Sequence, residues 1–416
     1  MPTFFRSVLL AAMLLAGVSR ADNWPQWRGP SANNQASQGD YPLTWSHSEN
    51  VLWRAKLPGG SGSTPVVWGD KILLTCPDDG KNTVICLDRN GNKLWQTKIN
   101  QERPGKHRKG SGSNPSPVTD GVHVYVYYKS GDLACLNMAG KVVWQKNLQQ
   151  LYGEDSLWWD LGTSPVLSEK SVIVACIQDA NPYIVALNKR TGEVHWKADR
   201  KLPAPTESAQ SYSTPLVMKK GRTETLVVLG GDHVTAHNVS DGKELWRVGG
   251  LNPTGDQYFR SIASPVISGD LVVAPYARGR TLTAIRLGGT GNVTDSHVAW
   301  TKKDISADVP SPAEMNGKVY VCGDRRNAGC IDAKTGSVVW MKPLPKSRSA
   351  YSASPILAGG KLYLTREDGT IFVLDTENDG EILATNSVEE KTIATPVLAN
   401  GRILIRTFEH LYCIGK

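Results

Sequence analysis

The stretch Cys330–Trp340, CIDAKTGSVVW, contains the unit from which this chain is built. Asp332 can accept a hydrogen bond from the backbone two residues on and so begin a turn, and Gly336 supplies the positive φ angle that such a turn needs. Because side chains alternate along a strand, Val338 and Trp340 fall on one face of the outgoing strand. The unit is therefore predicted to be an inner strand, a tight turn and an outer strand that carries a tryptophan.

The same unit recurs along the chain. Its copies lie at Cys86–Trp95, Cys135–Trp144, Ala186–Trp196 and Ala236–Trp246, with a stretched copy at Ala284–Trp300 and a copy without its tryptophan at Val373–Ala384. A small residue and a proline precede every copy, and these prolines are Pro65, Pro117, Pro165, Pro215, Pro265, Pro312, Pro355 and Pro396. Their spacing is 41 to 52 residues. A repeat of that period, with short strands and turns, is typical of a β-propeller.

The two ends of the repeat region complete each other. Val51–Leu57 resembles the outer strand of the later copies, but no inner strands precede it. Pro396–Ile414 holds three strands and stops before its own outer strand. We expect the first strand to pair with the last three, because closing the ring removes an open sheet edge. The sequence thus predicts an all-β fold over residues 51–416: an eight-bladed β-propeller of four-stranded antiparallel blades, about 46 residues per blade.

Residues 1–21 have the pattern of a secretory signal peptide. Arg6 provides a positive charge, Val8–Val18 is an apolar run, and Ser19-Arg20-Ala21 is a small-x-small cleavage site. The alternative, a membrane anchor, would need a longer apolar run to span a bilayer. We expect cleavage after Ala21 and an exported protein, either periplasmic or fully secreted.

Residues 22–50 form an N-terminal irregular extension in this prediction. Pro25 and Pro30 interrupt any strand ladder. Trp24 and Trp27 need a place where they can be buried, so we expect the extension to lie across the outside or the bottom of the propeller.

The charge of the chain is modest. The formal net charge is +8, or +6 without Arg6 and Arg20, and the one dense basic cluster is Lys106-His107-Arg108-Lys109. A nucleic-acid-binding protein would present a basic face, and export argues against that partner. We expect a monomer whose partner is a protein or an extended peptide, with no nucleic acid and no membrane span.

Seven cysteines are present, and two pairs lie in adjacent predicted strands of one repeat: Cys76 with Cys86, and Cys322 with Cys330. Export permits disulfides, so these pairs are candidates for bridges. The alternative is that the cysteines are small buried apolar residues, which we expect for Cys135, Cys176 and Cys413. No Cys/His spacing of a zinc site is present.

The unit's tryptophans are interpreted as structural. Each can bury roughly 200 Å² against a neighbouring blade, and the position recurs at one strand site around the ring. The alternative, a set of ligand-stacking platforms, would need them exposed.

The repeats resemble the PQQ-like (pyrrolo-quinoline quinone) repeat family, whose tryptophan-docking motif A-x-D-x-x-x-G-x-x-x-W is matched closely at Cys330–Trp340 and Ala186–Trp196. The opening WPQWRGP at Trp24–Pro30 is similar to exported members of planctomycete type. The resemblance covers the chain from Val51 onward and implies the propeller fold. The family includes quinone-dependent alcohol dehydrogenases and the non-catalytic propeller of the outer-membrane barrel-assembly machinery, so fold alone does not assign the function.

A quinoprotein would need particular groups. Calcium requires clustered carboxylate and amide oxygens, and alcohol oxidation requires a carboxylate base beside the metal. The family's dehydrogenases also resemble one another in a disulfide between adjacent cysteines over the cofactor. This sequence has no adjacent cysteines, no long insertions and no recurrent Asp/Glu/Asn cluster. No catalytic, cofactor-binding or metal-binding residue is therefore assigned.

The remaining candidates lie in the loops that lead from the outer strand of one blade to the inner strand of the next. Such loops converge at one mouth of a propeller's channel, where mixed aromatic and basic residues suit recognition. The candidate binding residues are Lys106, His107, Arg108, Trp158, Trp159, Asp160, Gln210, Tyr212, Gln257, Tyr258, Arg260, Arg348 and Tyr351. Consecutive tryptophans cannot share one face, so either Trp158 or Trp159 is expected to be exposed. The alternative is that these are ordinary solvated loops.

These observations favour a non-catalytic exported propeller that binds a protein or peptide in the cell envelope, through the mouth loops or by strand addition to a blade edge. The alternative is a PQQ-dependent alcohol dehydrogenase-like oxidoreductase with calcium, in which Trp159 or Trp158 stacks on the quinone and Asp160 is a base or ligand. Carbohydrate binding by exposed aromatics is a third hypothesis.

Overall fold

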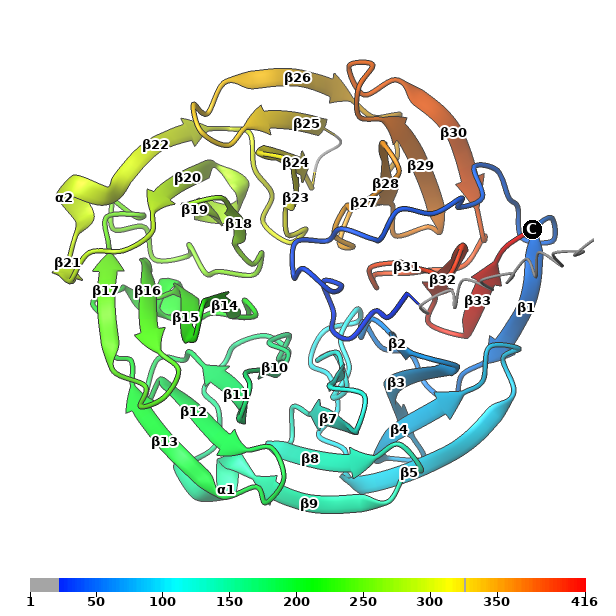
Figure 1. The fold of residues 1–416 in the computed structure, drawn as a ribbon, viewed down its shortest axis with the longest axis horizontal. Helices are drawn as coiled ribbons and strands as arrows, with labels where there is room; N and C mark the ends of the chain where they lie inside the picture. Colours follow the sequence, from blue (N-terminus) through cyan, green and yellow to red (C-terminus); the bar gives the residue numbers. More distant parts are fainter. Residues whose placement is uncertain (1–21, 325–326) are drawn as a thin grey trace, which may run out of the picture.

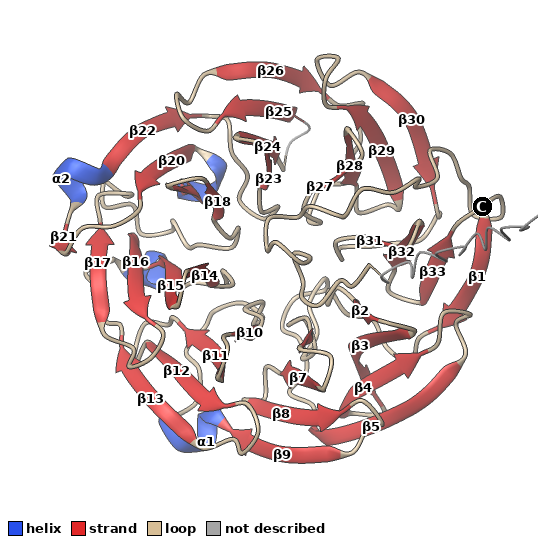
Figure 2. Cartoon of the chain, viewed as in Figure 1, coloured by secondary structure: helices blue, strands red, loops and turns tan. Residues whose placement is uncertain are grey.

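Eight β-sheets stand in a ring around a central axis (Figure 1). The computed structural model describes residues 22–324 and 327–416, so the predicted signal peptide lies outside the described residues. Helix is scarce in the part of the chain that the structure describes. Two short α-helices, α1 (Leu148–Tyr152) and α2 (Thr294–His297), lie at the rim (Figure 2), and a 3-10 turn covers Thr206–Ala209. The predicted eight-bladed propeller is confirmed.

In blades 1 to 7 the four main strands run outward from the axis in chain order, and each pairs antiparallel with the next. Blade 1 is β2 (Val66–Trp68), β3 (Lys71–Asp78), β4 (Lys81–Leu87) and β5 (Lys93–Gln101); blade 2 is β6 (Val118–Thr119), β7 (His123–Tyr127), β8 (Asp132–Asn137) and β9 (Val142–Asn147); blade 3 is β10 (Val166–Leu167), β11 (Ser171–Cys176), β12 (Tyr183–Asn188) and β13 (Val194–Asp199); blade 4 is β14 (Leu216–Lys220), β15 (Thr223–Gly230), β16 (His233–Asn238) and β17 (Glu244–Val248).

Blade 5 is β18 (Val266–Ser268), β19 (Leu271–Tyr276), β20 (Thr281–Arg286) and β22 (Val298–Lys303); blade 6 is β23 (Ala313–Met315), β24 (Lys318–Cys322), β25 (Asn327–Asp332) and β26 (Val338–Pro343); blade 7 is β27 (Ile356–Ala358), β28 (Lys361–Thr365), β29 (Thr370–Asp375) and β30 (Ile382–Ser387). Among the described residues, the stretched copy of the unit provides the one departure from four strands. Its inserted β21 (Gly291–Asn292) pairs in parallel with β17, which gives blade 4 a fifth strand.

The ring closes between the two ends of the repeat region, as expected. Blade 8 has the order β1 (Val51–Lys56), β33 (His410–Ile414), β32 (Arg402–Arg406) and β31 (Val397–Ala399). In its outer pair Val51 lies opposite Ile414 and Lys56 opposite His410. The N-terminal strand therefore supplies the outer strand that the C-terminal repeat lacks.

A second closed circuit surrounds the axis, formed by the residue before each repeat proline. In seven places its backbone N–H donates to the Ser or Thr hydroxyl at the same position in the next blade; for example, Thr214 N donates to Ser264 Oγ at 2.9 Å and Ser264 N to Ser311 Oγ at 2.7 Å. The other five bonds run from Thr64 to Ser116, from Ser116 to Ser164, from Ser164 to Thr214, from Ser311 to Ser354 and from Ser354 to Thr395. Thr64 Oγ1 closes the circuit by donating to the carbonyl of Thr395. A pre-proline residue is held extended, which keeps this hydroxyl in register from blade to blade.

The tryptophans join the blades on the outside. The indole of Trp144 packs against Gly192 in the turn of the next unit, and its Nε1 donates to the carbonyl of Lys189 at 2.8 Å. The same indole-to-carbonyl bond links Trp53, Trp95, Trp196 and Trp300 to the following blade. The structural interpretation of these residues is supported, because each of these rings bridges two blades.

The extension 22–50 crosses one end of the channel rather than running around the outside of the ring (Figure 1). There it pairs with the exposed edges of inner strands: Trp24 exchanges two backbone hydrogen bonds with Val67, and Ala36 and Asn34 bond to Leu357. Buried Arg28 donates to the carbonyls of Pro265 and Pro312. These bonds satisfy edges that would otherwise be open.

The seven cysteines are free, buried thiols, so neither candidate disulfide forms. The register explains this, because Cys76 lies opposite Thr83 while Cys86 lies opposite Leu73. Likewise Cys322 faces Ala328 and Cys330 faces Tyr320. The first pair is therefore offset along its ladder by three residues and the second by two, which is beyond the reach of an S–S bond. No helix among the described residues is long and apolar enough to cross a membrane.

Candidate functional site

An axial pocket of about 440 Å³ opens at the mouth where the interblade loops converge. Its wall is formed by the residues two positions before each Ser/Thr of the hydroxyl circuit. Because that circuit surrounds the axis, the residues above it form a ring as well. They are Gly62, Asn114, Gly162, Tyr212, Ile262, Val309, Ser352 and Ile393. The wall is mostly apolar with small gaps at the glycines, which is typical of a ligand pocket.

The floor of the axial pocket comes from the N-terminal extension. Trp27 lines the pocket together with the circuit residues Ser116, Ser164 and Thr395, and its Nε1 lies 3.4 Å from Thr395 Oγ1. The extension thus blocks the channel from the opposite end. A through-channel is converted into a pocket with one opening.

The basic cluster 106–109 folds over the opening and is fixed at several points. Both oxygens of Asp160 accept bonds from this loop, from Lys106 N at 2.7 Å and His107 N at 2.9 Å. The far side of the loop reaches blade 7, where Lys109 Nζ donates to Glu367 Oε1 at 2.7 Å. The loop therefore forms a tethered roof over part of the pocket.

Asp160 acts here as a structural anchor. Besides the two backbone bonds it accepts a bond from the buried Lys129 ammonium. Burial alone would raise the pKa of the Asp160 carboxyl, but the bonds from Lys129, Lys106 and His107 outweigh that effect and hold the pKa below its ordinary value. Its oxygens are thus engaged in holding the roof.

Three neighbouring loops, residues 155–160, 206–212 and 256–260, interlock beside the opening; we call them the triple-loop surface. Trp158 N donates to Gln210 Oε1 at 2.9 Å, and Trp159 N to the Tyr212 hydroxyl at 3.0 Å. Trp159 Nε1 donates to Glu207 at 2.7 Å. Gln257 joins through its carbonyl, which accepts from Ser208 N. These bonds fix the backbone and leave aromatic side chains outside.

Three large aromatics are exposed on the triple-loop surface: Trp158 by 47%, Trp159 by 42% and Tyr258 by 52%. Sequence reasoning expected one tryptophan to be exposed, and both are. His107 stands edge-on to Trp159 with ring centres 5.9 Å apart, and the Arg260 guanidinium lies 5.9 Å from the centre of the Trp159 ring.

Arg260 belongs to a buried charged group behind this surface. Its Nη2 donates to Asp308 Oδ2 at 3.0 Å, and Glu207 lies 3.5 Å from its Nε. Burial and the charge of Asp324 raise the pKa of Asp308 to about 7, against a lowering contribution from Arg278. Asp308 is therefore a group that titrates near neutral pH.

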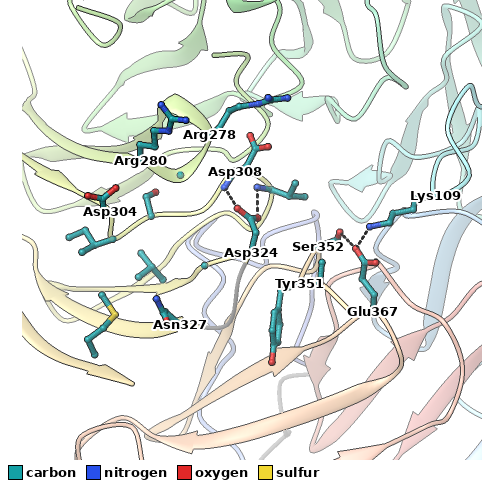
Figure 3. A pocket seen from close by; sticks show the side chains of 18 residues that line it. Lys109, Arg278, Arg280, Asp304, Asp308, Asp324, Asn327, Tyr351, Ser352 and Glu367 are labelled. Carbon is teal, nitrogen blue, oxygen red and sulfur yellow. Dashed lines mark hydrogen bonds and ion pairs between the residues drawn. The ribbon is translucent and has the colours of Figure 1, made fainter. Parts of the chain in front are cut away.

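A second cavity, the side pocket, adjoins the axial pocket and shares Lys109, Val309 and Ser352 with it. Its volume is about 670 Å³. Figure 3 shows Arg278 and Arg280 on one side and Tyr351 and Glu367 on the other. Glu367 accepts from both Lys109 and Ser352, so it links the roof to blade 7.

The candidate residues from the sequence therefore separate into groups. Around the axial pocket the structure brings together five of them: His107, Trp159, Asp160, Tyr212 and Arg260. Lys106 and Arg108 lie in the roof, while Trp158, Gln210, Gln257 and Tyr258 belong to the triple-loop surface. Tyr351 lines the side pocket, and the exposed Arg348 lines neither pocket.

Several residues of the site were missed by sequence reasoning. Trp27 was assigned only to burial. Lys129 and Glu367 lie in turns and Glu207 in a 3-10 turn, and no motif marks them. The wall residues did carry a signal, because each stands two positions before a Ser/Thr-Pro pair. Counting back from those pairs would have found the ring.

The quinone and calcium that some members of this fold use do not match the residues present. Among residues 22–324 and 327–416 no group of three or more His, Cys, Asp or Glu side chains is placed to hold a metal ion. The cysteines are all buried and none is adjacent to another. Asp160, the candidate base, has its oxygens engaged by three donors. No reaction step through a quinone is derived.

Comparisons with known proteins agree with the fold. The family model described as "Outer membrane protein assembly factor BamB" matches residues 43–176, 140–378 and 293–406. The outer membrane protein assembly factor BamB of Burkholderia pseudomallei (strain K96243) is 25% identical over 373 residues, covering 86% of this chain and 85% of the relative. That of Moranella endobia (strain PCIT) is 22% identical over 340 residues, covering 78% and 80%.

Two solved structures illustrate the breadth of this fold. BamB from Moraxella catarrhalis has a TM-score of 0.63 at 14% identity, covering 88% of this chain and 97% of that one. A europium-containing methanol dehydrogenase has a TM-score of 0.69 at 11% identity, covering 94% and 90%. At these identities the similarity shows the shared fold alone.

Proposed function

This chain belongs to the PQQ-like repeat family whose model is described as outer membrane protein assembly factor BamB, and from that membership we propose that it is a non-catalytic scaffold that binds a protein partner in the cell envelope. The binding face is the triple-loop surface with the adjoining roof. The signal-peptide pattern of residues 1–21 supports the location, and the relatives' name supports a role in outer-membrane assembly.

The observation that carries this proposal is the exposure of Trp158, Trp159 and Tyr258 on a rigid backbone. Tyr and Trp are enriched where protein interfaces have their strongest contacts. Here the loops that hold them are cross-linked by hydrogen bonds to Gln210, Tyr212 and Glu207. A prearranged surface loses little conformational entropy when a partner binds.

The charged groups of the site also favour binding over catalysis. Asp160 holds the roof, Glu367 holds Lys109, and Glu207 holds both Trp159 and Arg260. A general base must reach the proton that it removes. These carboxylates are engaged in fixing loops, which suits a scaffold.

The test uses Trp158→Ala with Tyr258→Ala in one variant. Neither side chain makes a hydrogen bond among the described residues, and both are exposed, so the fold is expected to be unchanged by circular dichroism and thermal melting. The variant and the wild type are used to capture cross-linked partners from the envelope of the source cells. We expect the partner recovered by the wild type to be reduced at least ~10-fold with the variant.

The matched control removes an exposed apolar side chain elsewhere, Leu151→Ala on α1. It should recover the partner as the wild type does. Equal recovery by the triple-loop variant and the control would remove this surface from the binding function.

The quinoprotein alternative makes an opposite prediction. Adding pyrroloquinoline quinone with calcium to the purified protein should leave the melting temperature, the absorbance spectrum and dye reduction with alcohols unchanged, because the ligand set is not assembled. A rise in melting temperature together with alcohol-dependent dye reduction would replace the scaffold by an oxidoreductase.

A further inference from the structure

The side chains that line the axial pocket have more hydrogen-bond donors than acceptors left without partners. At its floor, the hydroxyls of Ser116, Ser164 and Thr395 each accept a backbone N–H from the preceding blade. Their own protons have no acceptor among the described residues. A hydroxyl carries one donor and two acceptor sites, so each of the three keeps its donor for a ligand. Ser116 and Ser164 also keep one acceptor site, whereas Thr395 uses its second acceptor site on Trp27 Nε1.

The side-chain amide of Asn114 also offers hydrogen-bond donors to the axial pocket. Its Oδ1 accepts from Gly62 N, from Ser111 N and from Ser111 Oγ. Its Nδ2 makes no hydrogen bond within the described chain. Because the oxygen is fixed by three donors, the side chain of this half-buried wall residue offers only N–H groups to the pocket.

The opening adds further donors. His107 Nδ1 accepts from Lys109 N at 3.3 Å, which places the proton of the neutral imidazole on Nε2. Lys109 uses one ammonium proton on Glu367, and Arg260 uses Nη2 on Asp308. By contrast, the acceptors of the one lining carboxylate, Asp160, are occupied by three donors.

The charged groups that line the pocket are each paired with a group of opposite charge behind it. The lining includes two cations, Lys109 and Arg260, and one carboxylate, Asp160, whose charge is neutralised by Lys129 behind it. Each cation is also held by a carboxylate outside the pocket, so a bound anion would share these cations with Glu367, Asp308 and Glu207. Counted with Lys129 and these three carboxylates, the group carries no excess of positive charge. The affinity for an anion is therefore expected to be moderate and to come from the free hydrogen-bond donors rather than from net charge.

The apolar side chains of the axial pocket indicate what the rest of the ligand must contain. Ile262, Val309 and Ile393 form its wall, Trp27 its floor and Trp159 its edge. Apolar surface buried here contributes about 25 cal/mol per Å². A ligand with no apolar group would leave this surface in contact with water, and a ligand with no polar group would leave the pocket's donors without acceptors.

We propose that the axial pocket binds an apolar group that ends in a carboxylate. This inference deepens the proposed function and rests on it for the source of the ligand, which is either the C-terminal residue of a partner polypeptide or a free organic acid. Charge-assisted hydrogen bonds to a carboxylate are stronger than those to a neutral carbonyl, so the acid form should be preferred over its amide.

The experiment titrates four probes into the full-length mature protein by calorimetry: acetyl-Leu-Phe with a free carboxylate, its C-terminal amide, 3-phenylpropanoate and 3-phenylpropanamide. We expect each acid to bind at least ~10-fold more tightly than its amide, which corresponds to about 1.4 kcal/mol. Tighter binding of the dipeptide acid would identify a chain terminus as the source, and tighter binding of phenylpropanoate a free acid.

Two variants separate the polar and apolar contributions. Arg260→Gln should bring the acid and the amide to within ~2-fold of each other, and Asn114→Leu provides a second test of the donors if Arg260→Gln does not fold. Trp27→Leu should weaken the acid and the amide equally, because it alters only the floor. The control is Arg222→Gln, an exposed cation in the β14–β15 turn, which should leave both unchanged.

Equal affinity for acid and amide in the wild type, or no binding of any probe up to roughly 1 mM, would overturn the inference. The outcome is independent of partner capture. Probe discrimination with no captured partner would keep the pocket and remove the scaffold function. Partner capture without probe discrimination would keep the scaffold and remove this ligand.

Discussion

At the scale of single residues, each position of the repeated unit meets a specific demand from the neighbouring blade. The glycine of the unit does more than permit a turn. Gly192 adopts φ +71°, and the indole of Trp144 from the previous blade lies where a Cβ would stand. The tryptophan then donates to a carbonyl of the same turn. The tryptophan of one copy of the motif thus packs against the glycine of the next copy, and this contact joins successive blades.

This pairing can be measured with Gly192→Ala. The added Cβ would lie 2.7 Å from Trp144 Cδ2, so the indole must move. Overpacking of this kind costs about 1 to 3 kcal/mol of unfolding free energy, in addition to the strain of a left-handed alanine. Urea denaturation gives the total.

The control is Gly317→Ala, at φ +77° with nothing within 4 Å of the added Cβ. It carries the backbone strain alone, about 1 to 2 kcal/mol. If both variants lose the same stability, the contact with Trp144 contributes nothing and the glycine is required only for its φ angle.

Asp308 is expected to make stability depend on pH. Its folded pKa, about 7, is higher than the ordinary value of 3.8 because of burial and the nearby Asp324. The folded state therefore binds its proton more tightly than the unfolded state does, so the contribution is greatest below pH 4 and is lost as the pH rises from 4 through 7. Arg260, Arg278 and Glu207 are the other charges that face it.

Asp308→Asn should remove this pH dependence. We expect the stability of the variant relative to the wild type, measured by urea denaturation, to increase between pH 5 and pH 8. Asparagine can still accept from Arg260, so the neighbouring ion pair with Glu207 is retained. A relative stability that is constant across this range would mean that Asp308 is ionised throughout.

At the scale of elements, the N-terminal extension and the interblade loops have complementary roles. The extension satisfies inner-strand edges of several blades and provides Trp27 as the pocket floor. The loop 106–109 provides the roof, held by Asp160 and Glu367. The site therefore consists of irregular segments fixed on a rigid ring, which is the usual division between scaffold and function.

Arg28 is expected to control the docking of the extension. Its guanidinium is buried, and burial lowers its pKa to about 9, so it remains charged at neutral pH. Arg28→Ala removes the donors to the carbonyls of Pro265 and Pro312. The Pro312 carbonyl keeps its bond from Asn34 Nδ2, so the Pro265 carbonyl is the buried acceptor that loses its donor, at a cost of about 1 to 3 kcal/mol. Hydrogen exchange of residues 22–36 should become faster while the blades remain protected.

Arg222→Ala, which removes an exposed cation, serves as the comparison and should not alter exchange in the extension. Unchanged protection of residues 22–36 in Arg28→Ala would show that the backbone pairing of Trp24, Asn34 and Ala36 is sufficient by itself.

At the scale of the whole molecule, the ring is closed twice. On the outside, β1 completes blade 8 beside β33. Near the axis, the hydroxyl circuit runs through all eight blades and ends at Thr64 and Thr395. Each blade therefore depends on both neighbours, in contrast with an open repeat array whose ends are free.

Ser264→Ala would break the inner circuit at one point. The buried N–H of Thr214 would lose its acceptor, at a cost of about 1 to 3 kcal/mol in unfolding free energy. Ser264→Thr should restore most of this, because threonine already occupies the same position in blades 1, 4 and 8. Urea denaturation that gives the same midpoint for the alanine and threonine variants would contradict a stabilising circuit.

The sequence by itself determined the propeller, the number of blades and the mode of closure. These follow from local patterns that repeat: a turn residue, a glycine and a tryptophan at fixed spacing, and a Ser/Thr-Pro pair at each inner strand. It also located the loops of the mouth, and it identified Trp158, Trp159 and Tyr258 as part of one surface. These features could be predicted from the periodicity of the sequence, because each blade repeats the same local structure.

Only the tertiary structure decided what those loops do. That Asp160 holds the roof, that Arg260 pairs with Asp308, and that Trp27 closes the channel all depend on contacts between residues dozens to hundreds of positions apart in the chain. It also showed that the cysteine pairs are out of register. Such contacts leave no periodic trace, since each is made once, by the curvature of the ring that brings distant loops to a common axis.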